Sequence, residues 1–410
     1  MHRLLKSLVI LAALYVTAAC TATRPPEQPV PPVQPQGAVG GPGAATPLPA
    51  SAPAVTTPAP VPPVMLKPGA EPHIALLLPL NNPDLGQAAK AVQQGFLAAA
   101  GVQPGALPIR VYACNNEPKE VGALYKEALA SGAQAVVGPL TPAGVAALAS
   151  QSAVPVPTLV LNRVETQAPD QLYSFGLMLE NEARQAARVA SLAELHTAII
   201  VSSDNPLSRR LVDAFRTEWK KLGGDVAATV VFKGDTGVFA SLPVAPGSMV
   251  FVAANADTAR RFRPFLDPML PVYATSQIFK GNTHTLINYD LRDVVFFDMP
   301  WLLQTDHALV MRYPHLNPPG DVDTERLYAL GIDAYRLIRI VLDKQQQTAL
   351  PLGGVTGRIT LGANHMFERE ALQAEFANGL GMTPDAASAL EKANRGGTSP
   401  NGPVDPAAGE

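Results

Sequence analysis

Several residue types that functional sites often use are scarce in this chain of 410 residues. Its two cysteines, Cys20 and Cys114, are too few for a framework of several disulfide bonds. The seven histidines are scattered, and no two lie three or four residues apart, so the sequence holds no metal-binding motif. The formal net charge of −3 leaves no excess of positive charge to hold phosphate backbones. We therefore predict neither a metal site nor a nucleic-acid partner.

Motifs of the common enzyme classes are also missing from the sequence. No Gly-x-Ser-x-Gly elbow, Walker loop or dinucleotide fingerprint follows any expected strand. Carboxylates lie close together in residues 165–170 and 321–325, as an acid/base pair requires, but both segments have the character of solvated loops. The glycine-rich residues 37–43 have no strand before them. The sequence thus predicts no catalytic residues, no cofactor and no enzymatic activity.

The first residues have the composition of an export signal. Residues 1–19 combine a basic start with an apolar run, residues 8–16, and end just before Cys20. A membrane-spanning helix is the alternative, but this run is about half of the roughly 20 residues needed to cross a bilayer. We predict a lipoprotein signal peptide and a lipidated Cys20, with ordinary secretory cleavage left open because Thr17 stands where such signals usually have leucine. Since Thr21 follows Cys20, the resemblance to bacterial lipoproteins implies the outer membrane.

Proline dominates the next segment. Residues 21–72 contain sixteen prolines and only four charged residues. Such a segment cannot bury enough apolar surface to repay its ordering entropy, and its prolines stiffen it. We predict that residues 20–72, beginning at the lipidated Cys20, form a disordered tether that can span up to about 150 Å. The low-complexity residues 382–410 predict a disordered tail.

Between these ends, residues 73–381 repeat a unit of buried strand, polar turn and amphipathic helix. The expected strands are 74–78, 109–113, 135–137, 158–161, 197–201, 226–232, 249–253 and 272–275. The pattern is typical of parallel sheets with helices on both faces, and one core rarely grows past about 250 to 300 residues. We predict an α/β fold of two lobes, lobe 1 of about 73–175 and 300–350, and lobe 2 of about 176–299 and 351–381. Cys114, after the second strand, is expected to pack as a small apolar side chain rather than act as a reactive thiol.

The turns after the strands end in residues that favour helix starts. Three strands run into Asn82, Thr141 and Asn205, each followed by proline, and a fourth runs into Asp257. Carboxyl ends of parallel strands meet at one edge of a sheet, where open α/β folds place their ligand crevices. We predict a cleft between the lobes, although each residue can equally be only a structural cap. The candidate cleft residues are Asn81, Asn82, Pro139, Leu140, Thr141, Asn162, Ser203, Asp204, Asn255 and Ser276.

Particular segments carry a resemblance to known families. Residues 74–80 (Ile-Ala-Leu-Leu-Leu-Pro-Leu), 136–140, 159–162 and 215–224 are similar to the type I periplasmic binding protein fold. Residues 297–302 (Phe-Asp-Met-Pro-Trp-Leu), 326–334 (Arg-Leu-Tyr-Ala-Leu-Gly-Ile-Asp-Ala) and 355–361 resemble the penicillin-binding protein activator lipoproteins, the LpoA-like or LppC family. Residues 326–334, together with a lipoprotein signal, best distinguish this family from amino-acid receptors, which the strand segments alone would also fit.

The resemblance implies an outer-membrane lipoprotein that stimulates a class A bifunctional penicillin-binding protein, a peptidoglycan synthase anchored in the inner membrane. The best-known members carry a helical-repeat domain before the binding-protein-like domain. Residues 21–72 show no helical periodicity of about 34 residues, so the chain resembles a short form. A protein fixed in one membrane reaches a partner in the other only across a spacer, and the proline-rich tether provides one. We expect noncatalytic docking that favours the active state of the synthase.

A lipid-anchored solute receptor for an amino acid or peptide is the alternative function, since such receptors also carry lipid anchors. Receptors place hydroxyls and a carboxylate in the cleft, as Thr141, Ser203 and Asp204 could do here. Pro139 and Leu140, however, stand where a hydroxyl-rich turn would favour a ligand carboxylate. The sequence therefore favours the activator, and it leaves open whether the cleft binds a small molecule.

Overall fold

The computed structural model describes residues 64–151, 153–283, 285–343 and 349–396. The chain divides into two units, residues 1–58 and residues 59–410, and every structural statement below concerns the second unit. The predicted signal peptide, Cys20 and most of the predicted tether lie outside the described residues. Within the part that the structure describes, no helix is both long and apolar enough to cross a membrane.

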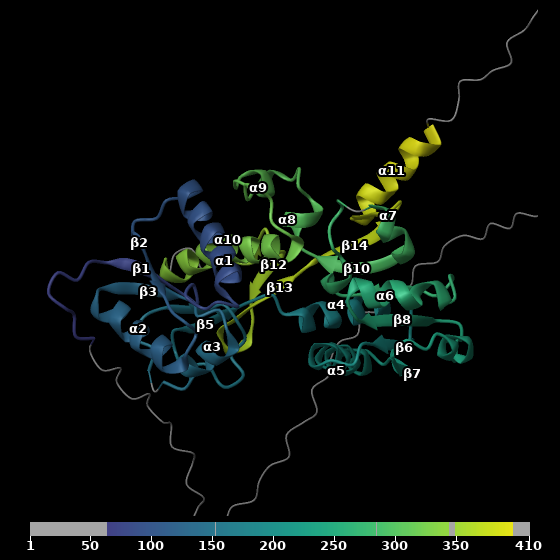
Figure 1. The fold of residues 1–410 in the computed structure, drawn as a ribbon, viewed down its shortest axis with the longest axis horizontal. Helices are drawn as coiled ribbons and strands as arrows, with labels where there is room; N and C mark the ends of the chain where they lie inside the picture. The colour runs from purple at the N-terminus through teal and green to yellow at the C-terminus, as the bar shows by residue number, and fades with distance from the viewer. Residues whose placement is uncertain (1–63, 152, 284, 344–348, 397–410) are drawn as a thin grey trace, which may run out of the picture. The chain divides into compact units, whose positions relative to one another are not determined.

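One sheet of eight strands forms the centre of lobe 1 (Figure 1), in the order β11-β12-β13-β5-β4-β3-β1-β2. Its strands are β1 His73–Leu78, β2 Ile109–Ala113, β3 Ala133–Val137, β4 Thr158–Val160, β5 Leu172–Phe175, β11 Leu352–Gly353, β12 Arg358–Leu361 and β13 Met366–Glu370. The strands from β2 to β13 are parallel, whereas β12 and β11 are added antiparallel at the edge. The predicted parallel sheet is thus a mixed one.

Helices cover both faces of this sheet because successive side chains of β1 point to opposite sides. Ile74 and Leu76 belong to a core with α1 (Gly86–Val102) and α10 (Val322–Leu342). Ala75 and Leu77 belong to a second core with α2 (Pro118–Ala130) and α3 (Pro142–Ala149). Cys114, which has no accessible surface, packs in that second core, as predicted.

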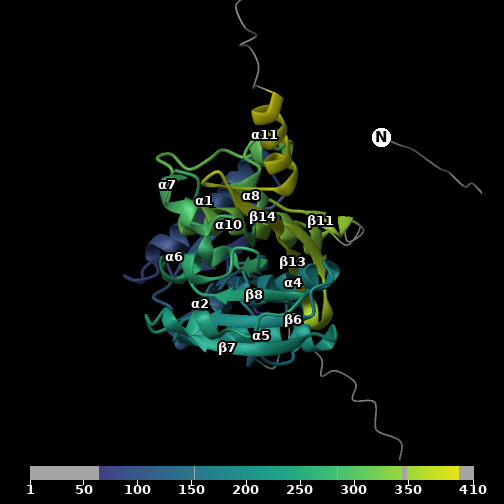
Figure 2. The same ribbon diagram turned by 90° about the vertical axis from the view of Figure 1, so that its right-hand side faces the viewer.

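A seven-stranded sheet forms the centre of lobe 2, in the order β15-β14-β10-β9-β8-β6-β7; Figure 2 shows β8, β6 and β7 side by side. Its strands are β6 Thr197–Ser202, β7 Asp225–Val231, β8 Ser248–Ala253, β9 Val272–Ala274, β10 Val294–Asp298, β14 Leu372–Ala377 and β15 Leu380–Met382. Here too the last two strands, β14 and β15, pair antiparallel to their neighbours. The two-lobed α/β fold is confirmed.

The helices of lobe 2 also lie on both faces of its sheet. One face packs against α4 (Leu179–Leu192) and α5 (Pro206–Lys221), through side chains such as Phe215 and Trp219. The other packs against α6 (Ala256–Phe262) and η3 (Ser276–Ile278).

The remaining helical segments of the described residues, from both lobes, are η1 Gly237–Ser241, η2 Arg263–Phe265, α7 Thr285–Asn288, η4 Tyr289–Leu291, α8 Pro300–Leu303, α9 Ala308–Met311, η6 Ala363–His365 and α11 Pro384–Gly396.

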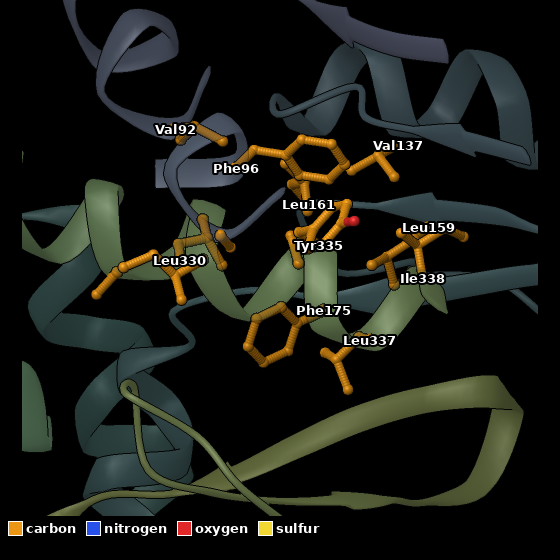
Figure 3. Close-up of a cluster of buried hydrophobic side chains, with 14 of the residues drawn as sticks. Val92, Phe96, Val137, Leu159, Leu161, Phe175, Leu330, Tyr335, Leu337 and Ile338 are labelled. Carbon is orange, nitrogen blue, oxygen red and sulfur yellow. The ribbon is translucent and has the colours of Figure 1, made fainter. Parts of the chain in front are cut away.

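Helices α1 and α10 approach closely at two glycines. A Cβ atom on Gly95 would lie 1.9 Å from the Tyr328 carbonyl oxygen, and one on Gly331 would lie 2.1 Å from the Val92 carbonyl oxygen. Only glycine leaves room for backbones at this separation. Beside the crossing, the rings of Phe96 and Tyr335 meet edge to face with centroids 5.1 Å apart (Figure 3). The motif at residues 326–334 lies in α10, and five of its side chains, among them Tyr328 and Ile332, belong to the core of lobe 1.

The chain passes between the lobes three times, and the last passage differs from the prediction. The first lies between β5 and α4, and the second lies between β10 and α8, whose Trp301 belongs to the lobe 1 core. The third lies between β13 and β14, at residue 371. Residues 351–370, which the sequence analysis assigned to lobe 2, therefore pair in the lobe 1 sheet. The assignment failed because the short strands in this stretch carry no signal that identifies their partner sheet.

Two predicted end segments are also more ordered than expected. Residues 64–72 precede β1 without forming a helix or strand, but the Lys67 amide donates to the Ala130 carbonyl oxygen (2.8 Å) and Val64 packs on the lobe 1 core. The predicted disordered tail instead starts at Met382, the last residue of β15, and continues into α11, whose Ala387 is buried against lobe 2. Residues 397–410 lie outside the described part of the chain.

Candidate functional site

Several of the predicted capping and cleft residues accept hydrogen bonds from backbone amides at helix starts. This is the structural role that the sequence left open beside ligand binding. Thr141 Oγ1 accepts from the Gly144 amide at the start of α3, and Asn255 Oδ1 accepts from the Thr258 amide (3.0 Å) at the start of α6. Asn205 caps α5 in the same way. Two residues expected to cap helices do not do so. Asp257 lies inside α6, and Asn82 Oδ1 accepts from amides of the turn that precedes α1, which starts only at Gly86.

The ten candidate cleft residues do not gather around one cavity. Asn162 lines a larger cavity, and Asn255 and Ser276 line a smaller one. The other seven line neither: Asn81, Asn82, Pro139, Leu140, Thr141, Ser203 and Asp204. Leu140 belongs to the lobe 1 core, and Asp204 pairs on the surface with Arg209 (3.0 Å). The crevice predicted at the strand ends is therefore occupied mainly by capping and packing interactions.

The larger cavity, of about 800 Å³, lies between helix α3 of lobe 1 and helix α5 of lobe 2. Apolar side chains of both helices and of residues 177–179, at the first passage between the lobes, line it. Several of its charged groups are paired with each other, Arg210 Nε with Glu180 (2.8 Å) and Arg163 with Glu165 (3.6 Å). Exposed pairs of this kind leave little unbalanced charge for a ligand.

The smaller cavity, of about 430 Å³, lies where α10 of lobe 1 meets α6 and η3 of lobe 2. Its lining residues are Leu177, Leu179, Asn255, Ser276, Gln277, Lys280, Asp323, Arg326, Leu327 and Arg369. The two arginines of this lining, Arg326 and Arg369, come from lobe 1. Both belong to buried ion pairs that join the lobes. Sequence reasoning named only Asn255 and Ser276 of this wall.

Arg326 joins α10 to lobe 2 through a buried ion pair. Its Nη2 donates to Asp298 Oδ2 (2.6 Å) at the end of β10, and to the carbonyl oxygens of Ser276 (2.9 Å) and Phe279 (3.1 Å). Asp298 has no accessible surface. Burial is the largest influence on Arg326 and would lower its pKa, but the carboxylates of Asp298, Asp323 and Glu182 together outweigh burial and raise it. Arg326 thus stays charged.

Glu182 and Arg369 form a second buried ion pair beside the first. Glu182 of α4 is 1 % exposed and binds Arg369 Nη2 of β13 through one oxygen, while the other oxygen accepts from the Ser276 amide (2.8 Å). Burial raises the pKa of Glu182 against the lowering influence of Arg369. Ser276 is the shared point, because its amide meets one pair and its carbonyl oxygen meets the other.

Asp333, in the same α10 motif, fastens the segment that leads into β12. Its Oδ2 accepts from the Thr356 amide (2.8 Å) and hydroxyl (2.7 Å), and its Oδ1 accepts from Arg336 (2.8 Å). Asp298, Arg326 and Asp333 all lie in residues 297–302 and 326–334, which carry the resemblance to the activator lipoproteins, so a charged residue inside an apolar run was the available signal. Glu182 and Arg369 carried no such signal.

The described residues hold no group of three or more histidine, cysteine, aspartate or glutamate side chains placed to bind a metal ion. The residues that line the two cavities offer hydrogen bonding, ionic contacts and apolar packing. These suit docking or ligand binding.

Proteins of known sequence and structure are similar to most of this chain. A family model described as LppC putative lipoprotein matches residues 46–242 and 245–379. Penicillin-binding protein activator LpoA from Pasteurella multocida is 27 % identical over 315 residues, which cover 75 % of this chain and 54 % of that protein. LpoA from Edwardsiella piscicida is 27 % identical over 329 residues, which cover 68 % of this chain and 47 % of the relative. The chain spans about half the length of these relatives.

Solved structures share the fold. The C-domain of LpoA from Haemophilus influenzae, described as a regulator of PBP1A, has a TM-score of 0.66, 24 % identity, and coverage of 76 % of this chain and 99 % of that one. A structure from Chromobacterium violaceum, described as a putative branched-chain amino acid ABC transporter, has a TM-score of 0.65 and 35 % identity, and covers 74 % of this chain and 100 % of that one. With its family model matched over most of its length, the chain belongs to the LppC lipoprotein family.

Proposed function

We propose that this chain is an outer-membrane lipoprotein that activates a class A bifunctional penicillin-binding protein by noncatalytic docking. The observation that carries the proposal is membership in the LppC family. Several proteins similar to this chain are named penicillin-binding protein activators. Those relatives are named as activators and not as catalysts, in keeping with a protein that acts by binding.

The anchor and the tether supply the reach that this function needs. Lipidation at Cys20 would hold one end of residues 20–63 at the outer membrane, and the folded domain follows from residue 64. A proline-rich segment rises by about 3.1 Å per residue when extended, so roughly 40 residues reach about 120 Å. The folded domain can then meet a synthase anchored in the inner membrane.

The ion pairs between the lobes favour docking over the opening and closing of a solute receptor. A receptor that closes on its ligand must change the contacts between its lobes. Here Arg326 and Arg369 of lobe 1 bind Asp298 and Glu182 of lobe 2 in buried positions. A domain held in this way presents a fixed surface to a partner.

The proposal is tested by measuring binding between the purified full-length chain and a purified class A synthase. We expect saturable binding that survives when the active-site serine of the synthase's transpeptidase domain is blocked by a β-lactam, because docking needs no catalysis by either protein. A matched solution without the chain is the control. Lack of binding in both states of the synthase contradicts the proposal.

A solute receptor is the second candidate, because the 35 % identical structure is described as a putative branched-chain amino acid ABC transporter. A closing receptor becomes more compact when it binds its ligand. Small-angle X-ray scattering with and without leucine, isoleucine and valine separates the two functions. We expect an unchanged radius of gyration, whereas compaction by one amino acid, together with no effect on a synthase, would favour the receptor.

A further inference from the structure

The smaller cavity has a wall with more positive than negative groups. Lys280, Arg326 and Arg369 line it, and Asp323 is the one carboxylate among its lining residues. The partners of the two arginines, Asp298 and Glu182, are 0 % and 1 % exposed and are not among those lining residues. The charged groups that face the cavity are therefore three cations and one carboxylate, and each cation is also paired with a carboxylate.

Three polar groups of this wall have hydrogen-bonding capacity that the described residues leave unused. The Lys280 ammonium lies 3.7 Å from Asp323, too far for a hydrogen bond, although the charges attract. Gln277 Oε1 and Arg369 Nε are buried without a hydrogen-bond partner. An unsatisfied buried group in a native wall requires a water molecule or another bound molecule to complete it. The wall is thus incomplete as it stands.

Asp323 occupies the position that an anion would take. Its carboxylate binds Arg326 Nη1 (2.6 Å) on one side and attracts Lys280 on the other, while 66 % of its side chain stays exposed. Moving the exposed Asp323 carboxylate away from Arg326 and Lys280 costs little free energy, because water can hydrate the separated charges. Asp323 therefore acts as a built-in competitor for a negatively charged ligand.

The size and the apolar part of the cavity limit the ligand. About 430 Å³ lies within the range of about 300 to 1,000 Å³ that is usual for small-molecule sites. Leu177, Leu179 and Leu327 offer an apolar surface beside the cations. Gln277 Oε1 needs an N–H or O–H donor. These features suit a molecule of dipeptide size with a carboxylate at one end and a donor nearby.

We propose that the cavity between α10, α6 and η3 binds a small carboxylate, such as the free carboxyl end of a short peptide, through Lys280, Gln277 and the guanidinium face of Arg326. Of the ten candidate cleft residues, only Asn255 and Ser276, which follow β8 and β9, line this cavity. It is formed with the lobes held as they are, and it does not depend on activation of a synthase.

The test is isothermal titration calorimetry of the purified full-length chain with L-alanyl-L-alanine and D-alanyl-D-alanine. Each dipeptide amide, which lacks the carboxylate charge, is the matched ligand control. We expect saturable binding of at least one dipeptide with a Kd below about 1 mM, and binding at least about tenfold weaker for its amide.

Three variants give the site a signature that damage to the fold cannot imitate. Lys280→Gln and Gln277→Met are expected to weaken binding about fivefold or more. Asp323→Asn removes the competing carboxylate and is expected to tighten binding about threefold or more. Lys90→Gln, on the exposed face of α1 and outside the cavity, is the control and is expected to bind as the unchanged chain does.

The outcomes separate this site from the proposed activation. No saturable binding of either dipeptide, equal binding of the amides, or unchanged affinity in Lys280→Gln and Asp323→Asn would overturn the inference. The same variants are assayed with a class A synthase. Stimulation that persists when dipeptide binding is absent leaves the activator function standing and removes only the carboxylate site.

Discussion

At the scale of single residues, Ser276 links two ion pairs that the sequence did not reveal. Its amide and carbonyl oxygen meet Glu182 and Arg326, so one short backbone segment orients charges from both lobes. A buried ion pair contributes modestly to stability while it is intact, because desolvation offsets attraction, but the loss of one partner strands a buried charge. Substitutions at these positions should therefore be costly.

Asp298→Asn leaves the buried Arg326 guanidinium without its counter-charge. We expect the free energy of unfolding to fall by about 3 kcal/mol, measured by urea denaturation at pH 7. Asp204→Asn is the matched control, since it breaks the exposed Arg209 pair and is expected to cost less than about 1 kcal/mol. Equal losses in the two variants would contradict the role given to burial.

Asp321 caps helix α10 with its side chain, which accepts from the Thr324 amide (2.7 Å). Hydrogen bonds from Thr324 lower the pKa of this carboxyl below its usual 3.8. A lowered pKa means stability that is present above pH 3.8 and lost as the pH falls through the folded-state pKa.

We therefore expect Asp321→Ala to cost about 1 kcal/mol at pH 7, and the difference from the unchanged chain to shrink as the pH falls below about 4. Urea denaturation at a series of pH values measures it. Asp321→Asn keeps a capping oxygen but has no titrating charge at this position. The difference in free energy of unfolding between Asp321→Asn and Asp321→Ala should therefore not change with pH. A difference that grows toward low pH would show that the sign is wrong.

At the scale of elements, the α1–α10 contact depends on glycine at the crossing. Gly95→Ala would place a methyl group 1.9 Å from the Tyr328 carbonyl oxygen, so the helices must move apart. We expect a loss of about 1 to 3 kcal/mol in urea denaturation. Gly122→Ala, in helix α2, meets nothing within 4 Å and is expected to stabilise by up to about 1 kcal/mol. Destabilisation by both would mean that the contact is not the cause.

Strands and long helices could be predicted because their residues repeat a local pattern. The six residues of β1 are all buried, as their apolar run indicated, and α5 buries the stripe that contains Leu211, Phe215 and Trp219. Partners distant in sequence could not be predicted. Strand β12 has one buried residue in four and carries nothing that distinguishes the lobe 1 sheet from that of lobe 2. Most residues that line the two cavities between the lobes were not named for the same reason, since partners such as Arg326 and Asp298 meet across 28 residues.

At the scale of the whole molecule, the proposed function makes the tether a spacer between two membranes. Deleting residues 25–60 should abolish function in cells, because the shortened segment no longer reaches, while the purified protein still binds the synthase. Growth of a strain that depends on this chain for synthase activation measures the first effect. Replacing the same residues by a Gly/Ser segment that matches their extended reach is the control, and full function of the deleted chain would show that reach is not required.

The rate of peptidoglycan synthesis by a purified class A synthase, with and without the purified full-length chain, tests the central claim most directly. Glycan polymerisation and crosslinking are followed separately, with heat-denatured chain as the control. We expect a faster rate that saturates as docking saturates and that is unchanged by Lys90→Gln. An unchanged rate at concentrations where the two proteins bind, or the absence of any binding, would contradict it.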